Sequence, residues 1–242
     1  MPRDSVYTYY KKYYTPNNMV MAIVGDINAD TALNLVKRYF GSLPKGIIQK
    51  DQYLPPEAKP SQRSEIKRDV AQAYLMIGMI GPQASDPHNY AVDILADILG
   101  NGESSRLRRT LQNEKRLVNS ISMSFDTRKY EGLIYVYATL DTANIQKVET
   151  AIKNIFSEIK EKGITEEELL KAKNSIKTNY YAGYEKGLDI ADNYAQSESF
   201  IGYKFARDYP NNIERVSLAQ VAAAARQYLQ TDSYVLSLVV PK

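Results

Sequence analysis

Residues 125–140, FDTRKYEGLIYVYATL, predict two β-strands that fold back on each other near a glycine. The first strand begins upstream, in the stretch NSISMSFDTR at 119–128, where apolar and polar side chains alternate. The returning strand at 133–140 alternates in the same way, and a period of two is typical of strands that bury one face. A tight turn at 129–132 would make the two strands antiparallel neighbours. The sequence therefore predicts a β-hairpin.

The polar side of this hairpin has an arginine and a tyrosine that could converge on something outside the sheet. Arg128 follows the first strand, and Tyr135 lies seven positions later in the second. From the residues alone, the plainer interpretation is a surface arginine beside a tyrosine-rich strand, because the chain has 20 tyrosines. Tyr130 and Tyr137 are alternatives to Tyr135 if the turn is shifted.

Helices surround the hairpin, and several have start signals. Asn28 and Asp30 mark a helix start, Pro87 lies in an expected first turn, and Thr165 with Glu168 forms a capping box. Because strands pair mostly as hairpins while helices cluster on one side, we expect an α+β fold with an antiparallel or mixed sheet and helices packed on one face. The expected helices are 6–14, 29–40, 85–102, 103–115, 142–163, one or two within 165–202, and the first part of 218–242; the other expected strands are 19–26, 70–81 and the end of 218–242.

A helix followed by a strand occurs near both ends of the chain, which suggests a duplicated domain whose first copy is present only as its tail. We therefore expect residues 1–50 to be the C-terminal tail of a preceding, similar α/β domain. Residues 51–65 belong to a stretch rich in proline, lysine and glutamine and are expected to be a linker. Residues 66–242 are expected to form one complete domain.

Composition excludes several classes of protein. The net charge is only +3 and runs such as RLRR resemble solvated helix faces, so we expect no nucleic-acid partner. No apolar run of about 18 residues occurs, so we expect a soluble protein without membrane insertion. Zero cysteines exclude a disulfide framework and thiolate metal sites. No secretory signal is visible, which says nothing if the chain is a fragment, and the compartment stays open between bacterial periplasm and cytoplasm.

Three stretches contain the most specific motifs: YYKKYYTPNNMVMAIVGDINADTALNLVKRYFGSLPKG at 9–46, DILADILGNGESSRLRRTLQNEKRLVNSISMSF at 93–125, and GITEEELLKAKNSI at 163–176. Together they resemble the insulinase-like family of zinc metallopeptidases, which includes pitrilysin and mitochondrial processing peptidase. The first two are specific in combination, whereas capped, glutamate-rich helices like the third are common. The resemblance implies paired, similar domains of the metallopeptidase α/β-roll type around a chamber, with this chain as a C-terminal portion.

The zinc motif of that family, H-x-x-E-H, needs two histidines one helical turn apart, a glutamate between them and a further carboxylate. This chain has one histidine, His88, for which we expect a surface or capping role. The consecutive glutamates at 166–168 would fan out around a helix and form a solvated first turn. We therefore expect no metal and no other cofactor in this chain, zinc in the missing half or in a partner subunit, and no peptidase activity by this chain alone.

The resemblance also implies roles for the hairpin residues. The family's second half supplies an arginine and a tyrosine, seven residues apart, that reach the substrate at the zinc site, and Arg128 with Tyr135 matches this spacing and strand context. Both side chains would hold the peptide or donate hydrogen bonds to the oxyanion that forms when metal-activated water attacks the carbonyl.

A glycine-rich loop, GNGESSRL, begins at Gly100. Because a helix precedes it and the lysine of a phosphate-binding loop is missing, nucleotide binding is not expected. Gly100 and Gly102 are expected to allow a tight turn, and Ser104 or Ser105 to cap the next helix. The resemblance places this loop near the chamber, which makes Gly100, Gly102, Ser104 and Ser105 candidates for substrate binding as well.

Two functions follow. In the first, the chain is the C-terminal, non-zinc-binding half of an insulinase-like metallopeptidase that helps bind a peptide substrate and stabilise the tetrahedral intermediate. Its partner would be a zinc-bearing N-terminal half or a homologous H-x-x-E-H subunit, in a homo- or heterodimer. The alternative is a catalytically inactive family member that acts as a scaffold or peptide-binding subunit.

Overall fold

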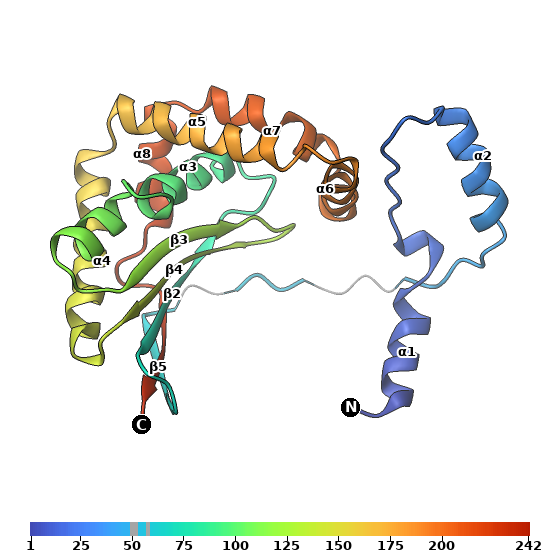
Figure 1. The fold of residues 1–242 in the computed structure, drawn as a ribbon. Coiled ribbons are helices and arrows are strands. Elements are labelled where there is room, and N and C mark those ends of the chain that lie inside the picture. The colour runs from blue at the N-terminus through green and yellow to red at the C-terminus, as the bar shows by residue number, and fades with distance from the viewer. Residues whose placement is uncertain (49–52, 57–58) are drawn as a thin grey trace. The chain divides into compact units, whose positions relative to one another are not determined.

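The computed structural model describes residues 1–48, 53–56 and 59–242 (Figure 1). The chain divides into two compact units, each of which combines segments from different parts of the sequence. The first unit consists of residues 1–54 with 181–209, and the second of residues 55–180 with 210–242.

The second unit contains, among the described residues, a five-stranded mixed sheet in the order β1-β5-β2-β4-β3 (Figure 1). β1 and β5 are parallel, and all other neighbouring pairs are antiparallel. The predicted hairpin is confirmed as β3 and β4, in which Ser124 lies opposite Tyr135. The strands are β1 Gln62–Arg68, β2 Ala73–Gly81, β3 Ser120–Asp126, β4 Gly132–Leu140 and β5 Val235–Pro241.

Helices pack on one face of this sheet (Figure 1). α3 packs on β3, and α8 packs on α3, α4 and β2. The predicted α+β class, with a mixed sheet and helices on one face, is therefore confirmed. The longer helices that begin in this unit's segments are α3 Asn89–Gly100, α4 Ile145–Lys162, α5 Glu166–Ala182 and α8 Leu218–Tyr228, and the shorter pieces are the π-helix η2 Arg108–Glu114 and the 3₁₀-helix η3 Thr142–Asn144.

Strand residues alternate between the helix-covered face and an open face. β2 and β4 bury every second residue, as the alternation predicts for β4. Each buried Leu, Ile or Val contributes about 1.5–3 kcal/mol to folding, so this row of apolar side chains fixes which face meets the helices. The large side chains that are fully buried here include Leu75, Ile77, Met79, Ile94, Leu95, Leu99, Ile134, Leu140, Ile152 and Phe156.

The first unit contains the helices α1 Arg3–Tyr13, α2 Ala29–Phe40 and α6 Gly187–Phe200 and the 3₁₀-helix η1 Pro16–Asn18. α2 has the predicted bounds, and the Asn28 side chain accepts a hydrogen bond from the backbone N–H of Thr31 at 3.1 Å. The strand predicted at 19–26 is wrong. A strand needs a neighbour for its backbone groups, and no described segment pairs with this one, so apolar side chains such as Met21 remain half-exposed.

Two helix predictions in the second unit need correction. α3 begins at Asn89, so Pro87 precedes the helix instead of lying in its first turn. The cause is Asp86, whose side chain accepts from the backbone N–H of His88 at 2.7 Å and whose carbonyl accepts from that of Asn89 at 3.0 Å. The helix expected at 103–115 is π-helical over Arg108–Glu114, where Lys115 N–H bonds to the Thr110 carbonyl.

Two further segments differ from the sequence expectations. Of the expected linker 51–65, residues 51–52 and 57–58 lie outside the described residues, and β1 already begins at Gln62. Helix α7, Lys204–Arg215, was not predicted and contains Pro210. Proline interrupts the backbone hydrogen bonds of a helix, which is why the sequence there does not indicate one.

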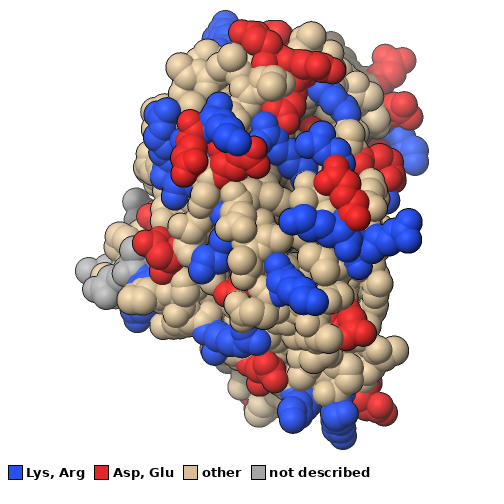
Figure 2. Space-filling view, turned by 90° about the vertical axis from the view of Figure 1, so that its left-hand side faces the viewer, with Lys and Arg blue, Asp and Glu red and all other residues tan. Residues whose placement is uncertain are grey.

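The surface shows mixed charge. Figure 2 shows lysine and arginine side chains interspersed with aspartate and glutamate on one face of the molecule. Across the described part of the chain, no helix combines the length and apolar character needed to cross a bilayer.

Candidate functional site

Arg128 lies in the turn that joins β3 to β4. The backbone N–H of Ala84 donates to the Arg128 carbonyl at 2.8 Å, which ties the turn to the segment after β2. The Arg128 side chain is 59% exposed, and its guanidinium lies 3.8 Å from an Asp126 carboxylate oxygen in an ion pair. Exposed ion pairs contribute about 0–1 kcal/mol, so this contact is readily exchanged for a ligand.

Tyr135 lies on β4, on the open face of the sheet. Its neighbours across the strands are Ser124 of β3 and Gly78 of β2. Both are small, and a side chain added at Gly78 would meet only Leu133 within 4 Å, at 3.7 Å. Tyr135 is half-buried, and both of its cross-strand neighbours are small residues. Arg128 and Tyr135 belong to the same hairpin, the first in its turn and the second within its returning strand.

The two alternative tyrosines lie in different places. Tyr130 is in the turn, 41% exposed, with the ammonium of Lys129 5.7 Å from its ring centroid. Tyr137 is on the open face opposite Ser122, and its ring centroid is 6.5 Å from that of Tyr74. Tyr135 and Tyr137 therefore face the same side, two positions apart, while Tyr130 belongs to the turn.

The two glycines of the glycine-rich loop have different roles in the structure. Gly100 ends α3, and a Cβ placed there would lie 1.9 Å from the backbone nitrogen of Met123. Only glycine therefore allows α3 to approach β3 this closely. Gly102 has a φ of +76°, in the left-handed region that favours glycine, and a Cβ there would meet nothing within 4 Å.

Ser105 directly precedes the following helix, and its carbonyl accepts a hydrogen bond from the Arg109 N–H at 2.9 Å, but neither serine supplies the side-chain capping bond that the sequence predicts. The hydroxyl of Ser104 accepts a hydrogen bond from the ammonium of Lys171 on α5. The hydroxyl of Ser105 is buried and has no hydrogen-bond partner among the described residues. Buried polar groups are nearly always paired in proteins, so Ser105 marks a place where a ligand or water can bind.

Gly102, Ser104 and Ser105 line a cavity of about 760 Å³, whereas Gly100 does not. This volume lies within the range of about 300–1,000 Å³ that is typical of small-molecule sites. α3 contributes Asp97 to the lining, and α5 contributes Lys171. The loop and α5 thus form two walls of one cavity.

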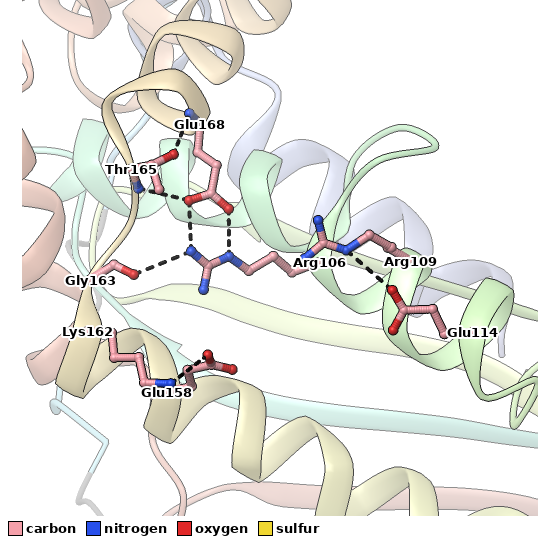
Figure 3. Close-up of polar contacts among 8 residues, drawn as sticks. All are labelled: Arg106, Arg109, Glu114, Glu158, Lys162, Gly163, Thr165 and Glu168. Carbon is pink, nitrogen blue, oxygen red and sulfur yellow. Dashed lines mark hydrogen bonds and ion pairs between the residues drawn. The ribbon is translucent and has the colours of Figure 1, made fainter.

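An ion pair that the sequence analysis missed joins these walls (Figure 3). The Arg106 Nε donates to Glu168 Oε1, and a second guanidinium nitrogen donates to Oε2, both at 2.7 Å. The same nitrogen donates to the Gly163 carbonyl at 3.4 Å. The bond from Arg106 lowers the pKa of Glu168 and raises that of Arg106. The sequence predicts Glu168 as part of a solvated first turn and of a capping box, whereas in the structure its carboxylate also binds Arg106.

The predicted capping box of α5 is confirmed and uses the same carboxylate. The Thr165 N–H donates to Glu168 Oε2 at 2.9 Å, and the Glu168 N–H donates to the Thr165 hydroxyl at 3.1 Å (Figure 3). The capping box is the sequence signal that locates Glu168. Its partner Arg106 lies 62 positions earlier, and no local pattern connects the two.

Asp97 is a second titratable group in the cavity wall. Its Oδ1 accepts from the Asn101 side chain at 2.6 Å and from the Ser175 hydroxyl at 3.1 Å. Burial raises the pKa of Asp97, and the bonds from Asn101 and Ser175 together with the charge of Lys171 oppose this effect.

His88 occupies the N-cap position of α3, and its side chain makes no capping hydrogen bond. Its Nδ1 is 3.0 Å from Asp86 Oδ1, and the Tyr228 hydroxyl donates to Asp86 Oδ2 at 3.1 Å. Burial, followed by the charge of Asp86, raises the pKa of Tyr228 to about 12. Among the described residues, no group of three or more histidine, cysteine, aspartate or glutamate side chains could hold a metal ion.

The chain matches known proteins over most of its length. It is 28% identical over 236 residues to an uncharacterized zinc protease of Mycobacterium leprae, covering 95% of this chain and 52% of that protein. It is 27% identical over 240 residues to the uncharacterized zinc protease YmxG of Bacillus subtilis, covering 98% and 58%. The chain therefore spans about half the length of these relatives.

Solved structures have the same fold. A protease from Helicobacter pylori superposes with a TM-score of 0.88 at 22% identity, over 100% of this chain and 60% of that one. A peptidase M16 inactive domain from Pseudomonas fluorescens gives a TM-score of 0.77 at 21% identity, over 90% and 52%. The family model described as the peptidase M16 inactive domain matches residues 1–176. The chain thus belongs to the family of peptidase M16 inactive domains.

Proposed function

We propose that this chain is the non-zinc-binding half of a zinc metallopeptidase, in which Arg128 and Tyr135 bind the peptide substrate and stabilise the tetrahedral intermediate. One observation supports this proposal above all. The backbone of Arg128 is fixed by a hydrogen bond while its side chain is exposed, and Tyr135 lies on the open face of the same hairpin. Donors held in place before the reaction act on the developing oxyanion without a reorganisation cost.

In this proposal the metal is bound elsewhere. The chain has one histidine and no cysteine, so it cannot supply the two imidazoles of an H-x-x-E-H site. The relatives named zinc proteases are nearly twice as long as the part this chain matches. A zinc-bearing N-terminal half or a homologous subunit would hold the metal and enclose a chamber with this chain, as a homo- or heterodimer.

Residues 1–50 would be the tail of a preceding, similar domain in this arrangement, and residues 66–242 the complete domain. Many apolar side chains of the first unit support this interpretation because they are exposed; among them are Tyr9, Tyr14, Met19, Met21, Ile23, Leu33, Tyr39 and Phe40. Exposed apolar surface of this extent marks an interaction site in soluble proteins. The remainder of the preceding domain would cover it.

The cavity beside the glycine-rich loop is a second proposed contact with the peptide. Three residues of its lining support this role: Ser105, whose buried hydroxyl has no partner within the described part of the chain, Gly102 with its left-handed backbone, and Ser104. The close approach of Gly100 to Met123 supports a packing role for that glycine instead.

The test is cleavage of a quenched fluorescent peptide library, with zinc, by this chain alone and by this chain mixed with an H-x-x-E-H polypeptide encoded upstream or nearby. Activity that appears only in the mixture, and that a chelator abolishes, is the expected result. A stable complex without activity would instead favour the scaffold alternative.

A further inference from the structure

We propose that Asn89 is a positioning residue for Arg128, acting through Thr127. The inference rests on the proposed function, because it assigns the contact that fixes the turn from which Arg128 would reach the substrate. Asn89 and Thr127 belong neither to the hairpin pair nor to the cavity described above.

Asn89 is the first residue of α3, and its side chain is fully buried. Its Oδ1 accepts a hydrogen bond from the Thr127 hydroxyl at 3.2 Å. The place of Asn89 is itself fixed, since its backbone N–H donates to the Asp86 carbonyl at 3.0 Å. The bond therefore connects the start of a core helix to the residue immediately before Arg128.

Two backbone hydrogen bonds hold the rest of the turn. The Ala84 N–H donates to the Arg128 carbonyl at 2.8 Å, and the Gly132 N–H donates to the Pro82 carbonyl at 3.1 Å. Together with the bond from Thr127 to Asn89, they attach the turn at three points to the segment after β2 and to α3. The fixed backbone contrasts with the exposed guanidinium, and this contrast is expected of a side chain that is aimed at a ligand.

The choice of asparagine at this buried position also has a cost. Its Nδ2 has no hydrogen-bond partner among the described residues, so the side chain satisfies its oxygen and leaves its nitrogen unpaired. An apolar side chain would avoid that loss but could not accept a bond from Thr127. The buried amide is therefore explained by the contact it makes with the turn.

The consequence for activity follows from geometry. A displacement of about 1 Å in a substrate-positioning group costs up to about 100-fold in rate. Thr127 is the better first variant, because valine has the shape of threonine without the hydroxyl and therefore opens no cavity. It does leave Asn89 Oδ1 without the bond from Thr127, and serine, which keeps the hydroxyl, is the control for that loss. Asn89 is less suitable as the first variant, because truncating a buried side chain destabilises the fold.

The experiment measures kcat and KM of the active mixture of this chain with its zinc-bearing partner for T127V, T127S, R128A and the double variant T127V/R128A. T150V, at an exposed threonine of α4, is the matched control. T127V should lower kcat about 10-fold or more, while T127S and T150V remain within about twofold of the wild type. In the R128A background, T127V should cause no further loss, because the two changes act through one group.

Other results of this experiment would separate a failure of the positioning role from a failure of the proposed function. Wild-type kinetics of T127V, or an equal loss from T127V with and without Arg128, would overturn the positioning role while leaving the proposed function intact. Full activity of R128A would remove the proposed role of Arg128 and the inference with it. The unfolding temperature of T127V should lie within a few degrees of that of the wild type, which shows that the variant is folded. A kcat of T127S as low as that of T127V would show that the hydroxyl is not the cause of the loss.

Discussion

Arg106 and Glu168 form a two-point ion pair between the glycine-rich loop and the first turn of α5. Glu168 also closes the capping box of that helix with Thr165. The Glu168 carboxylate therefore ties the loop to α5 and also accepts the backbone N–H of Thr165 at the start of that helix. Both partners keep some exposure, with 17% and 27% of the side chains accessible, so solvent weakens the attraction between the charges.

Glu168→Gln should lower the free energy of unfolding by about 1–2 kcal/mol at pH 7, because it removes the charge that Arg106 binds and keeps a similar shape. The folded-state pKa of Glu168 is lowered, so its contribution is present above the unfolded-state pKa and lost as pH falls through the folded-state value. Urea unfolding between pH 7 and pH 3 measures this: the difference in free energy of unfolding between Glu168→Gln and the wild type should become smaller at acid pH. Glu167→Gln, at the exposed neighbouring residue, is the control, and an equal effect of both variants would contradict the prediction.

Asp97→Asn should show the opposite pH dependence. Burial raises the folded-state pKa of Asp97, so ionisation costs more in the folded protein, and the carboxyl reduces stability as pH rises above its unfolded-state value of about 3.9. The stability of the variant relative to the wild type should therefore increase between pH 3.5 and pH 7. Urea unfolding at both pH values measures this difference in stability, and Asp232→Asn, at an exposed position, is the control. A difference between Asp97→Asn and the wild type that stays constant with pH would show that the raised pKa of Asp97 does not affect stability.

Gly100→Ala should be far more damaging than Gly102→Ala. The added Cβ at Gly100 would lie 1.9 Å from a backbone atom of β3, which forces α3 and β3 apart and should cost about 3 kcal/mol. Gly102 has open space around it, so alanine there should lower the free energy of unfolding only through the strain of the left-handed backbone, by about 1–2 kcal/mol. Chemical denaturation of both variants compares them directly, and equal losses would show that α3 can move away from β3.

Tyr135→Phe should lower kcat of the active mixture by about 100- to 1,000-fold while changing KM less, because it removes a donor that acts on the oxyanion. Tyr74→Phe, on the same open face, is the matched control. If instead Tyr137→Phe or Tyr130→Phe lowers kcat and Tyr135→Phe does not, the role passes to that tyrosine.

The elements that the sequence predicted correctly depend on neighbours within a few residues. The alternation of β3 and β4, the Asn28 cap and the capping box at Thr165 are all local patterns, and each is present in the structure. The fold class followed from the same patterns, because they fix which side of each strand meets the helices.

The features that sequence analysis missed depend on distant partners. β1 has a mostly polar sequence of exposed residues, and its strand conformation depends on pairing with β5. Residues 19–26 show the converse, since their strand pattern is strong but no described segment pairs with them. The pairing of Arg106 with Glu168 and the close contact at Gly100 likewise arise only when α3, α5 and β3 meet.

The position of β5 has a consequence for how the protein is made. This strand, residues 235–241, lies between β1 and β2, and β1 has no other described neighbour in the sheet. More than 160 residues separate β1 from β5, so during synthesis the backbone groups of β1 stay unpaired until those residues have left the ribosome. In this state β1, and the edge of β2 that β5 later covers, offer unpaired backbone groups to other chains until β5 pairs with both.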